Sequence, residues 1–118
     1  MKELWSKINE RFARKNTSRG SFKENRTTSV TSTYYGTDAD FYIGVVSEKP
    51  VTVYLPAAAP NGKIIIVKAE MRPPLGSRKV NIATTDGSLI DGYSDVSINV
   101  SHGCIKFIRN NNEWYIIG

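Results

Sequence analysis

The sequence contains one cysteine and one histidine among its 118 residues. Because Cys104 is alone, the chain cannot form an intrachain disulfide, and nothing in its cysteine content indicates an oxidising compartment. A nucleophilic dyad also needs an orienting group, and a structural zinc site needs four ligands. His102 and Cys104 have no such partners nearby in the sequence. We interpret them as a turn histidine beside a small buried cysteine, and we expect no enzyme activity.

Long hydrophobic runs are absent as well. No stretch approaches the roughly 18 consecutive apolar residues that a membrane span requires. The first residues have neither the apolar region nor the small-residue cleavage site of a signal peptide. We therefore expect a soluble protein made in a cytoplasm, without a membrane partner. Glycine-rich phosphate loops and the ligand order of a calcium loop are missing too. No metal or other cofactor is predicted, and the Asp-Gly pairs at 86–87 and 91–92 are interpreted as turns.

The positive charge is confined to the first quarter of the chain. Residues 1–26 hold eight basic and three acidic residues, whereas residues 27–118 hold eight of each, so the net charge of +5 lies entirely in the first segment. Such asymmetry suggests an arm that binds an acidic partner, either a protein surface or nucleic acid. The neutral remainder disfavours nucleic acid, because phosphate binding needs clustered Lys and Arg.

Residues 2–15 have the spacing of an amphipathic helix. Leu4, Ile8 and Phe12 recur every four residues, which places them on one helix face. A helix this short is marginal alone in water, so the face needs a surface to pack against. We expect it to dock onto another protein; folding back onto its own domain and lying on a membrane surface are the alternatives. The predicted partner-binding residues are Leu4, Trp5, Ile8, Phe12, Lys7, Arg11, Arg14 and Lys15.

Residues 16–37 are rich in Ser, Thr, Asn and Gly, a composition typical of a linker. From Asp38 onward, short runs rich in Val, Ile and Tyr recur about every ten residues between turn residues. The predicted domains are therefore an N-terminal anchoring arm over 1–37 and a β domain over 38–118, of which 39–118 should fold alone. The pattern predicts an all-β fold, a compact antiparallel sandwich or barrel-like domain of about seven short strands. Strands are expected at 39–46, 51–55, 63–69, 78–83, 96–100, 104–109 and 113–117.

The hydrophobic pattern differs between these strands. Val51, Val53 and Leu55 alternate with polar positions, as do Val96, Ile98 and Val100, which predicts half-buried strands. The runs 64–67 and 105–108 do not alternate cleanly, which is typical of central strands or of strands in a subunit contact. They favour a homo-oligomer, with a trimer as the first choice. The numerous tyrosines are interpreted as packing residues, and a sugar-binding or base-stacking surface is the alternative.

The β region also resembles virion proteins of tailed bacteriophages, of the fibre, tail and head-decoration type. The order and spacing of several short pieces over about residues 40–118 carry the resemblance. Residues 69–74 depart from the family pattern, and the first 37 residues have no counterpart in it. The matching pieces are Val-Thr-Val-Tyr-Leu-Pro-Ala-Ala at 51–58, Gly-Lys-Ile-Ile-Ile-Val-Lys at 62–68, Asn-Ile-Ala at 81–83, Gly-Ser-Leu-Ile-Asp-Gly at 87–92 and Asn-Glu-Trp-Tyr-Ile-Ile at 112–117.

The resemblance implies a non-enzymatic structural component of a virion, made in the host cytoplasm and usually a symmetric oligomer. The first expectation is a tail, baseplate or fibre-base protein attached through its N-terminal arm to other virion proteins such as portal, tail, baseplate or capsid subunits. Capsid decoration, a carbohydrate- or receptor-binding module and a nucleic-acid-binding protein using the basic arm are the alternatives.

Overall fold

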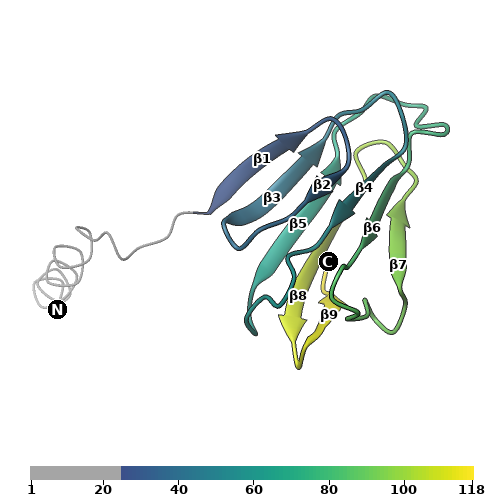
Figure 1. The fold of residues 1–118 in the computed structure, drawn as a ribbon. Coiled ribbons are helices and arrows are strands. Elements are labelled where there is room, and N and C mark those ends of the chain that lie inside the picture. Colours follow the sequence, from purple (N-terminus) through teal and green to yellow (C-terminus); the bar gives the residue numbers. More distant parts are fainter. Residues whose placement is uncertain (1–24) are drawn as a thin grey trace, which may run out of the picture.

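The computed structural model describes residues 25–118, and all regular secondary structure in this part of the chain is β-strand (Figure 1). The helix predicted over residues 2–15 lies outside the described residues. Nine strands are present: β1 (Arg26–Val30), β2 (Tyr34–Tyr35), β3 (Asp40–Val45), β4 (Val51–Tyr54), β5 (Ile64–Ala69), β6 (Val80–Ala83), β7 (Asp95–Ile98), β8 (Cys104–Asn110) and β9 (Glu113–Ile116). The all-β prediction is confirmed, and each of the seven predicted strands is found close to its expected position.

The strands form two mixed sheets that lie as two layers (Figure 1). The first sheet has the order β1-β3-β5-β8-β9, and the second has the order β2-β4-β6-β7. Up to β6 the chain alternates between the sheets, so each strand lies beside the strand two positions earlier and parallel to it. The last three strands add antiparallel pairs, β6 with β7, β5 with β8 and β8 with β9. The prediction of an antiparallel domain is therefore wrong for the first six strands.

The winding explains why strand periodicity alone could not give the pairing. A strand that crosses to the opposite sheet and returns lies parallel to its predecessor, whereas a hairpin returns within the same sheet. Both routes use short connections with turn residues, and both leave the same alternation of side chains. The sequence therefore indicates the strands but not which of them are neighbours.

A single apolar core lies between the sheets. Its largest fully buried side chains include Trp114, Phe107, Ile43 and Leu55. Burying an aliphatic or aromatic side chain of this size contributes about 1.5–3 kcal/mol to stability. Val51 and Val53 face the core as predicted, whereas Val100 is 63% exposed because β7 ends at Ile98.

Residues 26–35 do not form the linker that their composition predicts. β1 pairs with β3, and β2 pairs with β4, so both strands belong to the sandwich. Val30 of β1 is buried in the common core, and Tyr34 of β2 packs against it. Threonine favours strands as much as loops, and these two edge strands bury few apolar side chains, so their sequence carries little strand periodicity.

Candidate binding surfaces

The eight residues predicted to bind a partner lie outside the described residues, so their role stays a prediction. They are Leu4, Trp5, Ile8, Phe12, Lys7, Arg11, Arg14 and Lys15. The described residues offer four other features for analysis. These are a polar pocket at one end of the sandwich, a buried carboxylate cluster beside β1, and the outer faces of the two sheets.

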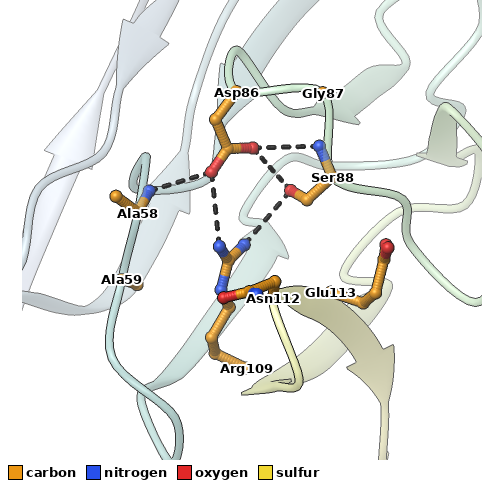
Figure 2. A pocket seen from close by; sticks show the side chains of 8 residues that line it. All are labelled: Ala58, Ala59, Asp86, Gly87, Ser88, Arg109, Asn112 and Glu113. Carbon is orange, nitrogen blue, oxygen red and sulfur yellow. Dashed lines mark hydrogen bonds and ion pairs between the residues drawn. The ribbon is translucent and has the colours of Figure 1, made fainter.

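The pocket has a volume of about 360 Å³ and lies where three connections meet (Figure 2). Ala58 and Ala59 come from the β4–β5 connection, and Asn112 and Glu113 come from the β8–β9 turn and the start of β9. The remaining lining residues are Asp86, Gly87 and Ser88 of the β6–β7 connection and Arg109 of β8.

Arg109 is the buried cation of this pocket, with 4% of its surface exposed. Strand alternation directs it inward, on the same face of β8 as Phe107. Its Nη2 lies 3.4 Å from Asp86 Oδ2, and its Nη1 donates to Ser88 Oγ at 3.1 Å. The guanidinium also lies 5.5 Å from the ring centroid of Trp114, its cross-strand partner on β9. Because an unpaired buried charge is costly, Asp86 acts as the counter-ion of Arg109.

Asp86 is held by several donors besides Arg109. The backbone N–H of Ala58 donates to it at 2.8 Å, and Ser88 donates from its backbone at 3.0 Å and from its hydroxyl at 2.6 Å. Desolvation alone would raise the pKa of Asp86, but these hydrogen bonds and the charge of Arg109 lower it to about 2. The carboxylate is therefore ionised at neutral pH, and a group with so low a pKa is poorly suited to general acid catalysis.

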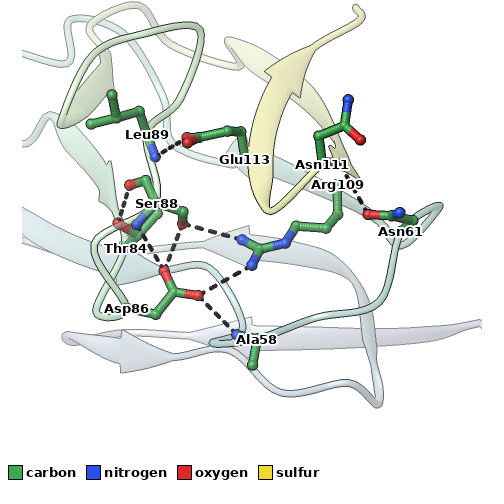
Figure 3. Close-up of polar contacts among 9 residues, drawn as sticks. All are labelled: Ala58, Asn61, Thr84, Asp86, Ser88, Leu89, Arg109, Asn111 and Glu113. Carbon is green, nitrogen blue, oxygen red and sulfur yellow. Dashed lines mark hydrogen bonds and ion pairs between the residues drawn. The ribbon is translucent and has the colours of Figure 1, made fainter.

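Further polar contacts tie the same connections together (Figure 3). Glu113 Oε1 accepts the backbone N–H of Leu89 at 2.5 Å, and Asn61 Oδ1 accepts that of Asn111 at 3.0 Å. Gly87 has a positive φ of 84°, as a turn requires, so the turn predicted at this Asp-Gly pair is confirmed. Arg109 and Asp86 are already paired with each other. The contacts around the pocket therefore hold the three loops together.

The second polar cluster surrounds Asp40, which has no exposed surface. Its carboxylate accepts hydrogen bonds from Arg26 at 2.6 Å, Thr28 at 2.6 Å, Tyr34 at 2.7 Å and the backbone N–H of Thr37 at 2.9 Å. Burial alone would raise the pKa of Asp40, but these bonds lower it to about 2. Asp40 thus fastens β1 and β2 to the start of β3.

The outer face of the first sheet carries an apolar stripe, defined here by Tyr42, Ile64, Ile66, Ile108 and Tyr115. Cross-strand pairing aligns Tyr42 with Ile66, and Ile64 with Ile108, which in turn pairs with Tyr115. Four of the five side chains are half-buried, and Tyr115 is exposed. The residues at 64–67 thus alternate between core and outer face, and β5 is the central strand of its sheet. Of the two alternatives predicted for 64–67, the central strand is confirmed, and the subunit contact stays a prediction.

Polar side chains border the apolar stripe. The hydroxyl of Tyr42 donates to Glu70, whose side chain lies over Gly44. Burial, followed by the hydrogen bond to Glu70 and the charge of that carboxylate, raises the pKa of Tyr42 to about 12. Lys106 pairs with Ile66 on the other side. The stripe is therefore apolar at its centre and polar at its rim, an arrangement that protein interfaces share.

His102 and Cys104 are placed by the turn between β7 and β8. His102 has a positive φ of 60°, which fits the predicted turn. Cys104 is exposed, so the expectation of a buried cysteine is wrong. Its side chain lies on the outer face of β8, opposite to the face that carries the buried Phe107. Within residues 25–118, no group of three or more His, Cys, Asp or Glu side chains is arranged to hold a metal ion.

The same described residues contain no helix that is long and apolar enough to cross a membrane. The chain matches no protein-family model and no curated protein sequence.

Proposed function

We propose that the chain is a non-catalytic structural subunit of a tailed-bacteriophage virion, in the tail, the baseplate or the base of a fibre. Its arm attaches it to other virion proteins, and its β domain packs against neighbouring subunits. The observation that carries the proposal is the apolar stripe on the outer face of the first sheet. A sheet whose central strand carries apolar side chains on both faces is typical of a protein that covers its second face in an assembly.

The residues that carry the phage resemblance support this proposal through their structural roles. Gly62 and Gly92 have positive φ angles of 92° and 87° and form turns, while Trp114 is fully buried. Ile64 and Ile66, from the segment 62–68, lie in the apolar stripe. The resembling pattern thus includes the residues of the proposed contact as well as those of the core.

The proposal is tested on particles. The test uses purified virions of a phage whose genome encodes the chain. Mass spectrometry is expected to detect several copies of the chain per virion, and a density map of the particle would then give the position of the chain. Density on the capsid lattice would favour the alternative of a decoration protein. Absence of the chain from intact virions would contradict the proposal.

The subunit contact is tested by placing a charge in the apolar stripe. We expect the purified chain to be a homo-oligomer, with a trimer as the first choice, and Ile66→Asp to convert it to a monomer, because a buried unpaired carboxylate is costly. Light scattering measures the mass, and circular dichroism checks that the variant is folded. Thr52→Asp, on the outer face of the second sheet, is the matched control and should leave the mass unchanged. A wild-type monomer at tens of micromolar would contradict the subunit contact.

A further inference from the structure

The outer face of the second sheet carries a column of aromatic rings. Tyr35 of β2 and Tyr54 of β4 are cross-strand partners, and their rings stack with centroids 4.6 Å apart and planes 9° from parallel. Tyr35 is 61% exposed, and Tyr54 is half-buried. The row continues across the sheet to Ala83 of β6 and Asp95 of β7. Two phenol rings are thus followed by a methyl group and then by a carboxylate.

A close backbone contact joins the strands that carry the two rings. The backbone N–H of Gly36, next to Tyr35, donates to the carbonyl oxygen of Tyr54 at 2.7 Å. A Cβ atom at Gly36 would lie 2.9 Å from that oxygen and 3.2 Å from Pro56 Cδ, so only glycine permits this approach. Because the two rings already stack on each other, binding would require less ordering of side chains.

Ala83, the next residue in the row after Tyr54, carries only a methyl group. Neighbouring strands lie about 4.7–4.9 Å apart, which matches the spacing of the two stacked rings. The single methyl group of Ala83 is too small to cover the ring of its neighbour Tyr54. A flat group about as thick as a ring can therefore stand over Ala83 and stack on Tyr54.

Polar groups beside this position suit hydroxyl groups. In the adjacent row, Thr52, Asn81 and Ser97 are cross-strand partners on the same outer face. Ser97 Oγ donates to Asn81 Oδ1 at 3.2 Å, and the Nδ2 donors of Asn81 form no hydrogen bond among the described residues. Asp95 supplies an exposed acceptor at the end of the column. The site therefore offers an aromatic face, two amide donors and carboxylate and hydroxyl acceptors.

We propose that this face binds carbohydrate, with one pyranose ring standing over Ala83 against Tyr54. The C–H bonds on the flat side of a sugar carry partial positive charge, which the negative face of a tyrosine ring attracts. The hydroxyl groups of the sugar then reach Asn81, Thr52 and Asp95. The two rows contain no Lys or Arg, and a carboxylate ends the column, so the face lacks the cations that a phosphate backbone requires.

This site goes beyond the proposed function and is independent of it. The second sheet turns its outer face away from the first sheet, whose outer face bears the apolar stripe. A subunit packed through the stripe would keep the tyrosine column exposed. Failure of the glycan experiment would therefore leave the virion proposal standing, and the reverse also holds.

The experiment uses the full-length chain on a microarray of α- and β-linked hexose and N-acetylhexosamine oligosaccharides. The strongest binder is then measured by titration calorimetry. We expect Tyr54→Ala to weaken binding at least about tenfold, by analogy with the loss of a stacked base. Ala83→Leu, which places a bulky side chain at the proposed sugar position, should weaken it similarly, whereas Val46→Ala, at an exposed position outside both proposed surfaces, should leave it unchanged.

Circular dichroism and melting curves establish that each variant is folded, and Ala83→Leu keeps the test decisive if Tyr54→Ala is unstable. The proposal is overturned if no glycan on the array binds the wild-type chain, or if binding survives both substitutions in folded protein. Tight binding of a thymidine 12-mer that the same substitutions abolish would assign the column to bases and would overturn it as well.

Discussion

Asp40 shows how one residue can decide where a domain begins. Its carboxylate is fully buried and is satisfied by donors from β1, β2 and the connection before β3. Buried carboxylates are rare unless paired, so each donor helps to retain the charge. Its principal ionic partner, Arg26, is itself half-exposed, which leaves the hydroxyl and backbone donors as the buried part of the cluster.

We predict that Asp40→Asn destabilises the protein by about 2–4 kcal/mol. The amide cannot accept from all four donors, and hydrogen bonds to a charged group contribute roughly 1.5–3 kcal/mol each. Urea unfolding measures the free energy of unfolding. Asp38→Asn is the matched control, because Asp38 is exposed and should change stability by less than about 0.5 kcal/mol. Equal stability of the two variants would contradict the role given to Asp40.

The depressed pKa values of Asp40 and Asp86 also predict how stability depends on pH. Both are lowered from 3.8 to about 2 in the folded protein. Ionisation therefore favours the folded state above the unfolded-state pKa, and this contribution is lost as pH falls from about 4 to about 2. We expect a melting temperature that is nearly constant from pH 5 to 7 and falls between pH 4 and 2.

The control for the pH experiment is the double variant Asp40→Asn with Asp86→Asn. It should be less stable at pH 7 and should show a smaller decrease below pH 4. A wild-type melting temperature that stays constant down to pH 2.5 would show that these carboxylates do not stabilise the fold as their contacts imply.

β1 and β2 are the edge strands of the two sheets, on the same side of the sandwich (Figure 1). We predict that removal of residues 1–24 leaves the melting temperature of the β domain nearly unchanged. Removal of residues 1–37 deletes both strands and all four donors to Asp40, and should lower the melting temperature by more than about 10 °C. Calorimetry of the two truncated chains checks this. Equal melting temperatures would instead support the boundary at residues 37 and 38 that composition predicts.

Most elements of the fold could be predicted from the sequence, because alternation and turn residues are local signals. The seven strands from 39–46 to 113–117 follow from them. β1 and β2 could not be predicted in the same way, because a buried carboxylate and its polar partners hold them. The stacking of Tyr35 on Tyr54 could not be predicted from the sequence either. It depends on the parallel pairing of β2 with β4, which joins residues far apart in the sequence.

The polar pocket illustrates the same limit. Asp86-Gly87 is recognisable as a turn, but its pairing with Arg109 spans 23 positions. The local signal for the pair is Arg109 itself, a charged residue two positions after Phe107 and therefore on the same strand face. An inward-facing charge requires a buried counter-ion, which Asp86 supplies from a distant loop.

The three proposed binding regions have different chemistry. The apolar stripe on the first sheet suits a second subunit, and the tyrosine column on the second sheet suits a sugar. The basic segment before residue 25 suits attachment to an acidic protein surface. Such a division would let one small domain assemble, bind a ligand and remain anchored without competition between the surfaces.

The proposed anchoring arm combines aromatic and basic side chains. A buried Trp or Phe side chain contributes several kcal/mol when it fills a pocket, whereas exposed ion pairs contribute about 0–1 kcal/mol each. We therefore expect Trp5→Ala with Phe12→Ala to abolish incorporation into particles while the β domain stays folded. Replacing Arg14 and Lys15 by Gln should weaken incorporation only mildly and mainly slow association. Quantitative mass spectrometry of purified virions measures incorporation.

The reverse ranking would change the interpretation of the arm. If the charge substitutions abolished incorporation and the aromatic ones did not, the arm would be an electrostatic tether. The salt dependence of binding then distinguishes a nucleic-acid partner from a protein partner. An arm bound to DNA displaces counterions at each phosphate contact, so its affinity falls steeply between 50 and 200 mM salt. An arm docked through Leu4, Trp5, Ile8 and Phe12 depends on apolar burial and should respond weakly over that range.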